Sequence, residues 1–415
     1  MTDRPNDRKK IGRLLGASGL MIGLLLASVA PAAANSLGDF LTDGSLLLNA
    51  RYRYEHVDQS GFSKDAAAHT VRLRAGYQTP VFHGLQALLE VQATGHISNT
   101  FNDTVNGRTA YPVVPDPENF QLNRLQLRYT DVPDTALTVG RQEINLDDQR
   151  FVGAVAFRQN EQTFDAVRID NTSLPGLSFT YIYLDRVNRV FGVYSSQNHF
   201  SGDVHLINIA YDLKQVGKVT AYAYLLGLDD APSLSTQTYG ASLTGRHPLS
   251  RFTSLSYRLE GATQEPYFNN PQRFDLTYLR GEFGLSSGLW SAMGGIEYLD
   301  GNNAIGFSTP LATLHKFQGL ADVFLTTPAS GIIDTYGKLG VAKNVTLGAL
   351  RGVAISGWYH DFANPHGGTL GSEFDLDATL KFGPHVSTSL TYANYDGVKA
   401  YASRNRIWFT VELSN

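Results

Sequence analysis

The 415-residue sequence contains no cysteine, and this absence excludes several kinds of protein. A chain without cysteine has no disulfide framework, no thiolate metal site and no lipid-modified N-terminal cysteine. Charged residues are also scarce, at 17% of the chain, whereas tyrosine and phenylalanine number 21 and 22. Low charge with many aromatic rings is typical of proteins whose rings lie at the two interfaces of a membrane.

Long apolar stretches are also lacking, except at the N-terminus. Five basic residues between positions 4 and 13 precede an apolar stretch at 14–30, and Pro31 and Ala32-Ala33-Ala34 follow it. This order predicts a secretory signal peptide, residues 1–34, cleaved after Ala34. Three glycines within the apolar stretch argue against the alternative, a helix that anchors the chain in a membrane.

The mature chain, residues 35–415, has no second apolar stretch long enough for a membrane-spanning helix, so it is either soluble or a β-barrel. Residues 1–34 hold five basic and two acidic residues, which leaves 29 basic and 36 acidic residues and a net charge of −7. This balance gives no reason to expect binding to nucleic acid.

Polar and apolar residues alternate along many segments. Residues 48–55 alternate leucine, alanine and tyrosine with asparagine, arginine and glutamate, and 71–78 and 85–92 repeat the pattern. In 373–382 five apolar residues oppose five polar ones. This period of two predicts strands with one apolar and one polar face. A soluble β-sandwich has the same period, so periodicity alone leaves both architectures open.

The spacing of the turns separates the two architectures. Nine long connections alternating with eight short turns predict 18 strands, to within two, in an all-β, antiparallel, up-and-down transmembrane barrel that forms a single domain over residues 35–415. The short turns are expected at 80–84, 131–134, 172–176, 214–217, 247–251, 286–288, 342–345 and 383–385. The long outer connections are expected at 58–65, 97–118, 144–163, 188–202, 229–235, 265–272, 300–331, 361–370 and 396–403.

In a closed barrel the apolar face meets lipid, so the charged residues of the alternating segments should face the lumen. Arginines gather in the first six predicted strands, whereas carboxylates predominate in the later ones. An arginine arc facing an acidic arc would favour polar solutes. The alternative is that these charges only pair with one another and hold the wall. The arginines of the arc are Arg51, Arg53, Arg72, Arg74, Arg124, Arg128 and Arg168.

The third long connection and its flanks, residues 141–165, combine charges, amides and aromatic rings at high density. We hypothesise that this segment folds into the pore as a constriction, with Arg141, Arg150 and Arg158 as donors that face an anion. The alternative is an outward loop held by its own salt bridges.

This segment resembles the alginate-export family of outer-membrane barrels. The resemblance rests on Gly140-Arg141-Gln142, on residues 145–147, 149–153 and 158–165, and on a second block at 315–328. It implies an 18-stranded monomeric barrel with an arginine-rich constriction for an anionic polysaccharide. The role it implies is carried over only to Arg141, Arg150 and Arg158.

The sequence gives little support for a catalytic or metal-binding site. Residues 284–288 fit the pattern G-x-S-x-G, but Ser286 stands at the end of a predicted strand and not at a strand-to-helix elbow. His360 and His366 are separated by a loop, and Asp147-Asp148 lacks the ligand spacing of a calcium loop. We therefore expect no catalytic residue, no metal and no cofactor.

The sequence thus predicts a channel in the bacterial outer membrane that passes polar or anionic solutes, with export of a polysaccharide such as alginate as one role. The alternative is a diffusion porin for uptake of small organic acids or sugars, and an outer-membrane hydrolase is a remote one. The expected partners are outer-membrane lipid, the barrel-assembly machinery, the solute and, for export, periplasmic secretion components. Export and uptake need the same wet lumen, so the sequence leaves both open.

Overall fold

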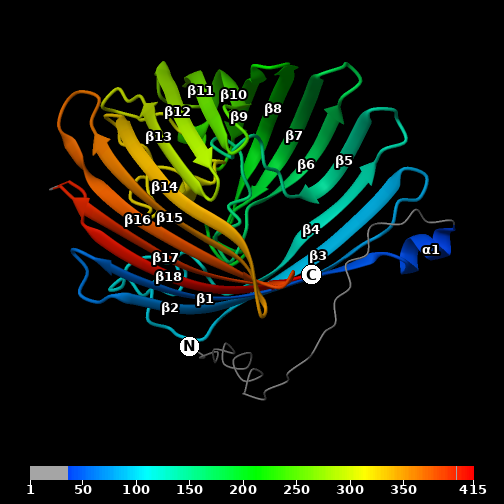
Figure 1. Ribbon diagram of the computed structural model, residues 1–415, viewed down its shortest axis with the longest axis horizontal. Coiled ribbons are helices and arrows are strands. Elements are labelled where there is room, and N and C mark those ends of the chain that lie inside the picture. The colour runs from blue at the N-terminus through cyan, green and yellow to red at the C-terminus, as the bar shows by residue number, and fades with distance from the viewer. Residues whose placement is uncertain (1–35, 399) are drawn as a thin grey trace, which may run out of the picture.

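The computed structural model describes residues 36–398 and 400–415 (Figure 1). The predicted signal peptide, residues 1–34, therefore lies outside the described residues. The described chain begins with a short helix, α1 (Leu37–Thr42), capped by Ser36, whose Oγ accepts a hydrogen bond from the Asp39 backbone N–H. Two single-turn 3₁₀ helices, η1 (Pro232–Leu234) and η2 (Leu314–Lys316), lie in connections. None of the described helices has the length and apolarity needed to span a membrane.

Eighteen strands follow α1. The first nine are β1 (Ser45–Gln59), β2 (Ala66–Gln78), β3 (Leu85–His96), β4 (Asn119–Tyr129), β5 (Thr135–Gln142), β6 (Thr163–Asn171), β7 (Leu177–Asn188), β8 (His199–Leu213) and β9 (Gly217–Leu228). The second nine are β10 (Thr236–Pro248), β11 (Thr253–Pro266), β12 (Leu276–Ser287), β13 (Trp290–Leu299), β14 (Ile332–Leu347), β15 (Leu350–Ala363), β16 (Thr369–Phe382), β17 (Val386–Gly397) and β18 (Arg404–Ser414).

The strands form one closed sheet. Each strand pairs antiparallel with its neighbours in the chain, and β18 pairs with β1 from Asn49↔Ser414 to Gln59↔Arg404. Closure removes the free edges that an open sheet would expose to lipid. The predicted all-β barrel of 18 strands is confirmed, and Figure 1 shows its wall curving round an interior, with α1 standing beyond the start of β1.

One predicted turn is wrong. The turn expected at 342–345 belongs to β14, which continues to Leu347, and the chain reverses at Gly348 and Ala349. Gly348 has φ +58°, a conformation that glycine adopts at little cost. A tight turn at 342–345 would require this conformation of residues that carry a side chain, for which it is unfavourable. The position of the tight turn therefore follows the glycine.

Alternate residues of a strand face lipid and lumen. In β16, Phe374 is 47% exposed on the outer face, whereas Glu373 and Asp375 are buried on the inner face. In β2, Leu73 is exposed on the outside while its neighbour Arg72 is buried. A cation on the outer face at mid-membrane would cost about 2–4 kcal/mol. The alternation thus explains why charges of the strand interiors collect inside.

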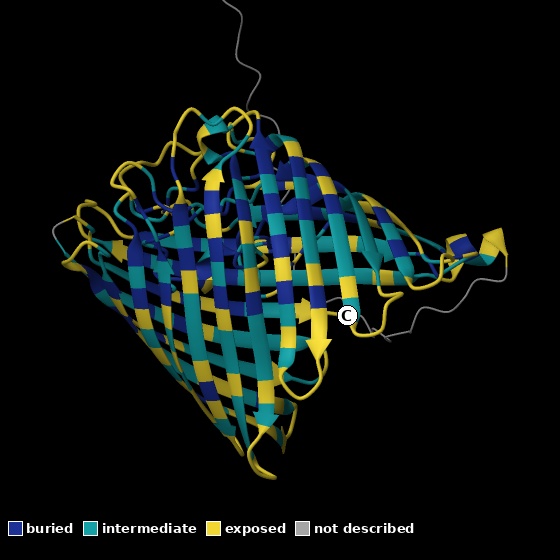
Figure 2. Ribbon diagram, turned by 90° about the horizontal axis from the view of Figure 1, so that it is seen from above, coloured by how far each residue is buried: buried dark blue, intermediate teal, exposed yellow. Residues whose placement is uncertain are grey.

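The two ends of the barrel differ in how they are filled. In most strands the buried residues concentrate in the half that adjoins the long connections, as Figure 2 shows, and in β11 they occur only in the second half. Two connections fill this half: residues 143–162 between β5 and β6, here called inner loop 1, and residues 300–331 between β13 and β14, here called inner loop 2. They pair through the bridge Val152↔Leu311, and both residues are fully buried.

Candidate functional site

Inner loop 1 lies inside the barrel, against the wall formed by β1. The Arg51 Nη1 donates to the carbonyl oxygen of Ala156 at 3.0 Å, and the Arg53 Nη1 donates to that of Phe157 at 2.5 Å. The Phe157 ring stacks on His315 of inner loop 2, with centroids 3.5 Å apart. The wall and inner loop 2 therefore hold inner loop 1 from two sides.

Arg150 joins inner loop 1 to the opposite wall. Its Nε lies 2.6 Å from Glu297 Oε1 on β13, and its Nη1 and Nη2 donate to Thr309 and Gln318 of inner loop 2. The Tyr278 hydroxyl also donates to Glu297, at 2.7 Å. Arg150 and Glu297 are each 2% exposed, so this ion pair is fully enclosed.

Arg158 is the centre of a second buried cluster. Its guanidinium lies 3.1 Å from Glu55 of β1, 2.7 Å from Asp322 of inner loop 2 and 3.8 Å from Asp116. Arg406 of β18 contacts the same Glu55 and Asp322. Burial opposes the charge of Arg158, yet the three carboxylates raise the pKa of its guanidinium above the ordinary value.

Asp322 shows the reciprocal effect. Burial alone would favour its neutral form, but His315, Arg406 and Arg158 hold the pKa of this carboxyl well below its usual range. The carboxylate is therefore the stable form, and it connects inner loop 2 both to inner loop 1 and to the wall.

These contacts correct the predicted direction of two arginines. Arg150 and Arg158 were expected to face an anion in the lumen, but both are buried and bonded to carboxylates of distant segments. Arg141, at the end of β5, forms two hydrogen bonds to Asp165 of β6, at 2.6 and 2.8 Å, and its side chain is 22% exposed. All three arginines position the loop in this structure.

The wall arginines of β1 and β2 are arranged differently. Arg51 and Arg72 both pair with one carboxylate, Glu412 of β18, at 2.9 Å each. The Arg72 Nη2 also donates to the Asn49 side chain, while its buried Nε and Nη1 have no hydrogen-bond partner among the described residues. Two buried guanidinium groups thus share one negative charge.

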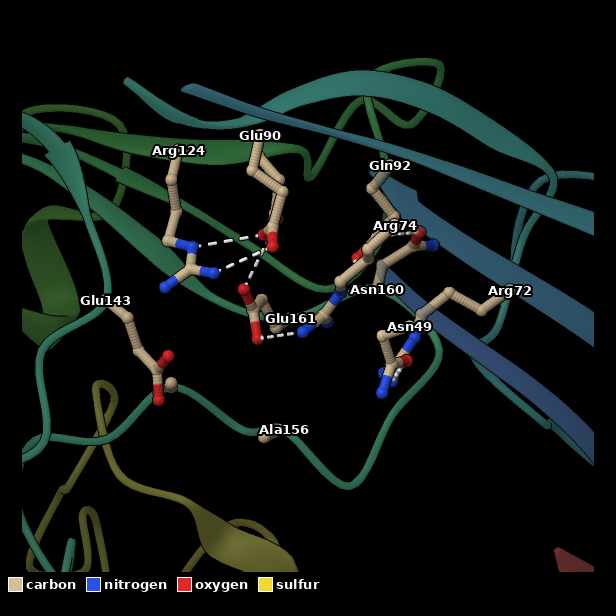
Figure 3. Close-up of polar contacts among 12 residues, drawn as sticks. Asn49, Arg72, Arg74, Glu90, Gln92, Arg124, Glu143, Ala156, Asn160 and Glu161 are labelled. Carbon is tan, nitrogen blue, oxygen red and sulfur yellow. Dashed lines mark hydrogen bonds and ion pairs between the residues drawn. The ribbon is translucent and has the colours of Figure 1, made fainter. Parts of the chain in front are cut away.

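A polar network continues from this pair along the wall (Figure 3). Arg74 lies 2.7 Å from Glu161 of inner loop 1, and Arg124 of β4 lies 2.7 Å from Glu90 of β3. The Asn123 amide donates to both carboxylates and so connects the two ion pairs.

Nearby, Glu143 stands at the start of inner loop 1 (Figure 3). Burial and the charge of Glu161 raise the pKa of Glu143.

The predicted arc also contains arginines without a carboxylate. Arg53 has none within 4 Å among the described residues and bonds instead to Phe157 and Thr410. Arg128 of β4 is exposed and makes no ion pair or hydrogen bond within the described part of the chain. The remaining arginine of the arc, Arg168 of β6, pairs with Asp170 at 2.7 Å.

The six arginines of β1, β2 and β4 outnumber their carboxylates. Among the described residues, three carboxylates lie within 4 Å of them: Glu412, Glu161 and Glu90. This stretch of wall therefore carries a net positive charge toward the lumen. The arginines are Arg51, Arg53, Arg72, Arg74, Arg124 and Arg128.

On the opposite wall the charges are matched pair by pair. Arg258 of β11 lies 2.8 Å from Glu260, and Arg280 of β12 lies 2.9 Å from Glu282. Arg280 also contacts Asp148 of inner loop 1 at 2.6 Å. Burial works against this carboxylate, but Arg280 and Arg258 lower the pKa of Asp148 below its ordinary value. This wall therefore offers less free positive charge than the first.

Two cavities flank the inner loops. One, of about 380 Å³, is lined mostly by inner loop 2 and by Arg189 and Phe200 near the outer strand ends, and is here called the outer cavity. The other, of about 430 Å³, is lined by mid-strand residues such as Glu282, Lys338 and Trp358, and is here called the inner cavity.

Sequence reasoning missed the carboxylates that hold the loops. Glu55, Asp116 and Glu297 follow ordinary strand or loop patterns, and nothing local marks them as partners of Arg158 or Arg150. Asp322 and Gln318 lie in the second block of family resemblance, 315–328, and that block is the one signal that pointed to inner loop 2.

The sequence matches the profile of the family described as "Alginate export" over residues 45–287, more than half of the chain. The matched region includes inner loop 1 and ends before inner loop 2. No curated protein matches the sequence.

Several solved structures share the fold. Pseudomonas aeruginosa OccK9 (OpdG) is similar with a TM-score of 0.69 and 14% identity, covering 91% of this chain and 100% of that chain. P. aeruginosa OpdK, solved with vanillate, has a TM-score of 0.68 and 15% identity, covering 91% and 99%. Acinetobacter baumannii OccAB4 has a TM-score of 0.67 and 13% identity, covering 89% and 97%. At these identities the likeness establishes the barrel architecture alone.

Proposed function

Because the chain belongs to the alginate export family, we propose that this outer-membrane channel passes anionic solutes and that an anionic polysaccharide such as alginate is its cargo. The family and the closed barrel point to a channel for solutes and away from an enzyme. The proposal includes insertion by the barrel-assembly machinery, action as a monomer and, for export, delivery by periplasmic secretion components.

One observation carries the anionic part of the proposal: the excess of guanidinium groups over carboxylates along β1, β2 and β4. Arg72 adds two buried donor nitrogens that have no hydrogen-bond partner among the described residues. Arg72 is 2% exposed, so it acts on a passing anion through its charge and not through direct contact. Arg128, which has no partner within the described part of the chain, extends the positive wall toward the periplasmic end.

A second candidate, uptake of small organic acids or sugars, is favoured by the size of the cavities. Cavities of about 380 and 430 Å³ suit single small molecules more than an extended polymer. Inner loops 1 and 2 would have to move further for a polysaccharide than for a small acid.

The proposal is tested with purified protein in a planar lipid bilayer under a salt gradient. We expect a zero-current potential that reports anion selectivity and a current that short alginate oligosaccharides block. Block by vanillate but not by the oligosaccharides would favour the small-acid alternative. A cation-selective current would contradict both the anionic polysaccharide and the small organic acids as cargo.

A further inference from the structure

The outer and inner cavities meet at a thin partition made of side chains. Gln318 of inner loop 2 lines both cavities. Arg150 lines the outer cavity and Glu297 lines the inner one, and these two residues are joined by the 2.6 Å ion pair. The two hollows are therefore separated by an arginine, a glutamate and a glutamine.

The partition is closed by hydrogen bonds. The Gln318 side chain accepts from Arg150 Nη2 at 3.4 Å and donates to Glu297 Oε2, so it bridges both members of the ion pair. All three residues are at most 4% exposed, so the partition itself is closed in this conformation. Side chains can change rotamer, whereas backbone crossing the same place would block it permanently.

The backbone beside the partition is strained. Gln149, which precedes Arg150, has φ +71°, and Gln318 has φ +53°. Left-handed conformations are unfavourable for residues with a side chain, and they persist where the surrounding structure enforces them. The contacts around the partition, including those of Gln149 to Thr313 and of Gln318 to Glu297, therefore hold both residues in conformations that cost free energy.

We propose that Arg150, Glu297 and Gln318 form the gate of the permeation route, and that this route runs through the outer cavity, beside Arg189 and Phe200, and through the inner cavity, which β11–β16 line. The proposal rests on the channel function proposed above and adds to it a path and a gate. A solute that passes must replace the bonds of the gate. It offers a carboxylate to Arg150 and a hydroxyl or amine donor to Glu297, so the gate favours hydroxylated anions.

The alternative route follows the arginine wall, past the exposed Ala156 of inner loop 1 (Figure 3). The carbonyl oxygen of Ala156 accepts a hydrogen bond from Arg51. There the guanidinium groups of Arg51 and Arg53 bond to the loop backbone and tie the loop to the wall. The arginine wall thus secures inner loop 1, and the passage between the cavities lies on its other side.

The absence of cysteine makes the two routes directly testable, because an introduced cysteine is the one thiol in the chain. Two variants, Gln318→Cys and Ala156→Cys, are studied in planar bilayers with a charged methanethiosulfonate reagent added to one side at a time. We expect the reagent to remove most of the current of Gln318→Cys from either side and to leave the current of Ala156→Cys largely unchanged. Both substitutions replace an uncharged residue with cysteine, so the ion pairs of the wall remain.

Block at Ala156→Cys without block at Gln318→Cys would overturn the proposed route while leaving the channel function intact. A Gln318→Cys variant that conducts normally and never reacts would overturn the gate. If the unmodified protein carries no current at all, the proposed function fails first and the gate fails with it. A Gln318→Ala variant, which removes the bridging amide without stranding a charge, gives a second measure, and we expect more frequent opening.

Discussion

Two sets of arginines lie inside this barrel, and they differ in how completely they are neutralised. Arg150 and Arg158 of inner loop 1 each meet at least one buried carboxylate, and both are nearly inaccessible. The wall arginines of β1, β2 and β4 outnumber their carboxylates two to one. The difference lies in charge compensation: the loop arginines are neutralised at close range, whereas the wall arginines leave a net positive field across the lumen.

The energetics of burial support this division. An ion pair taken out of water is strongly destabilising when one partner is lost, by about 3–5 kcal/mol, because the other charge remains buried. Arg72 shares Glu412 with Arg51, so its removal leaves no carboxylate without a cationic partner. Substitution should therefore affect stability in the first set and selectivity in the second.

The largest effect is expected from removing the part of inner loop 1 that contains both loop arginines. A variant lacking residues 146–158 loses the ion pairs to Glu297 and Asp322 together with the aromatic ring of Phe157. Since this segment fills the outer half of the lumen, single-channel conductance should rise several-fold. Unchanged conductance would show that the segment does not restrict the pore.

The second-largest effect is expected to distinguish the buried cluster around Arg158 from the partly exposed ion pair of Arg141 and Asp165. Arg158→Met leaves Glu55 and Asp322 with less compensation, and we expect a loss of about 3–5 kcal/mol in the stability of the loop packing, seen as earlier proteolysis of inner loop 1. The matched control is Arg141→Met, whose partly exposed pair with Asp165 should be worth only about 0–1 kcal/mol. Equal protease sensitivity of the two variants would contradict the claim that the buried ion pairs of Arg158 stabilise the loop more than the partly exposed pair of Arg141.

The smallest effect is expected from acidification. The pKa of Asp322 is lowered in the folded protein, so its stabilising contribution is present above the unfolded value of about 3.9 and is lost only as the pH falls through the lower folded value. The closed state of the inner loops should therefore be the same at pH 7 and pH 5. Opening that begins between these two values, measured as a rise in conductance, would show that another group controls the loops.

The barrel was largely predictable from sequence because its signals are local. Alternation such as that of Phe374 and Asp375 reports the two faces of a strand, and glycine and proline mark most of the turns. The turn at 342–345 was predicted wrongly because the alternation of polar and apolar residues weakens near the periplasmic end of β14. The chain reverses only at Gly348, which has a positive φ.

The candidate site was predictable only in outline. The density of charge in residues 141–165 correctly indicated an unusual loop, but the orientation of Arg150 depends on Glu297, 147 residues away. A single sequence contains no pattern that pairs such distant residues. The same holds for Glu412, which Arg51 and Arg72 share because β18 closes against β1.

The central claim, that the wall arginines select the solute, is tested most directly by the zero-current potential of a variant carrying Arg53→Gln, Arg72→Gln and Arg128→Gln. None of these substitutions leaves a carboxylate without a cationic partner. Glu412 still pairs with Arg51, and Arg53 and Arg128 have no carboxylate partner within the described residues. The matched control removes the same charge outside the lumen, through Arg251→Gln, Arg273→Gln and Arg351→Gln at exposed positions. We expect anion selectivity in the unmodified protein and the control, and a potential shifted toward cations in the lumen variant. An unshifted potential in the lumen variant, or an equal shift in both, would contradict the account.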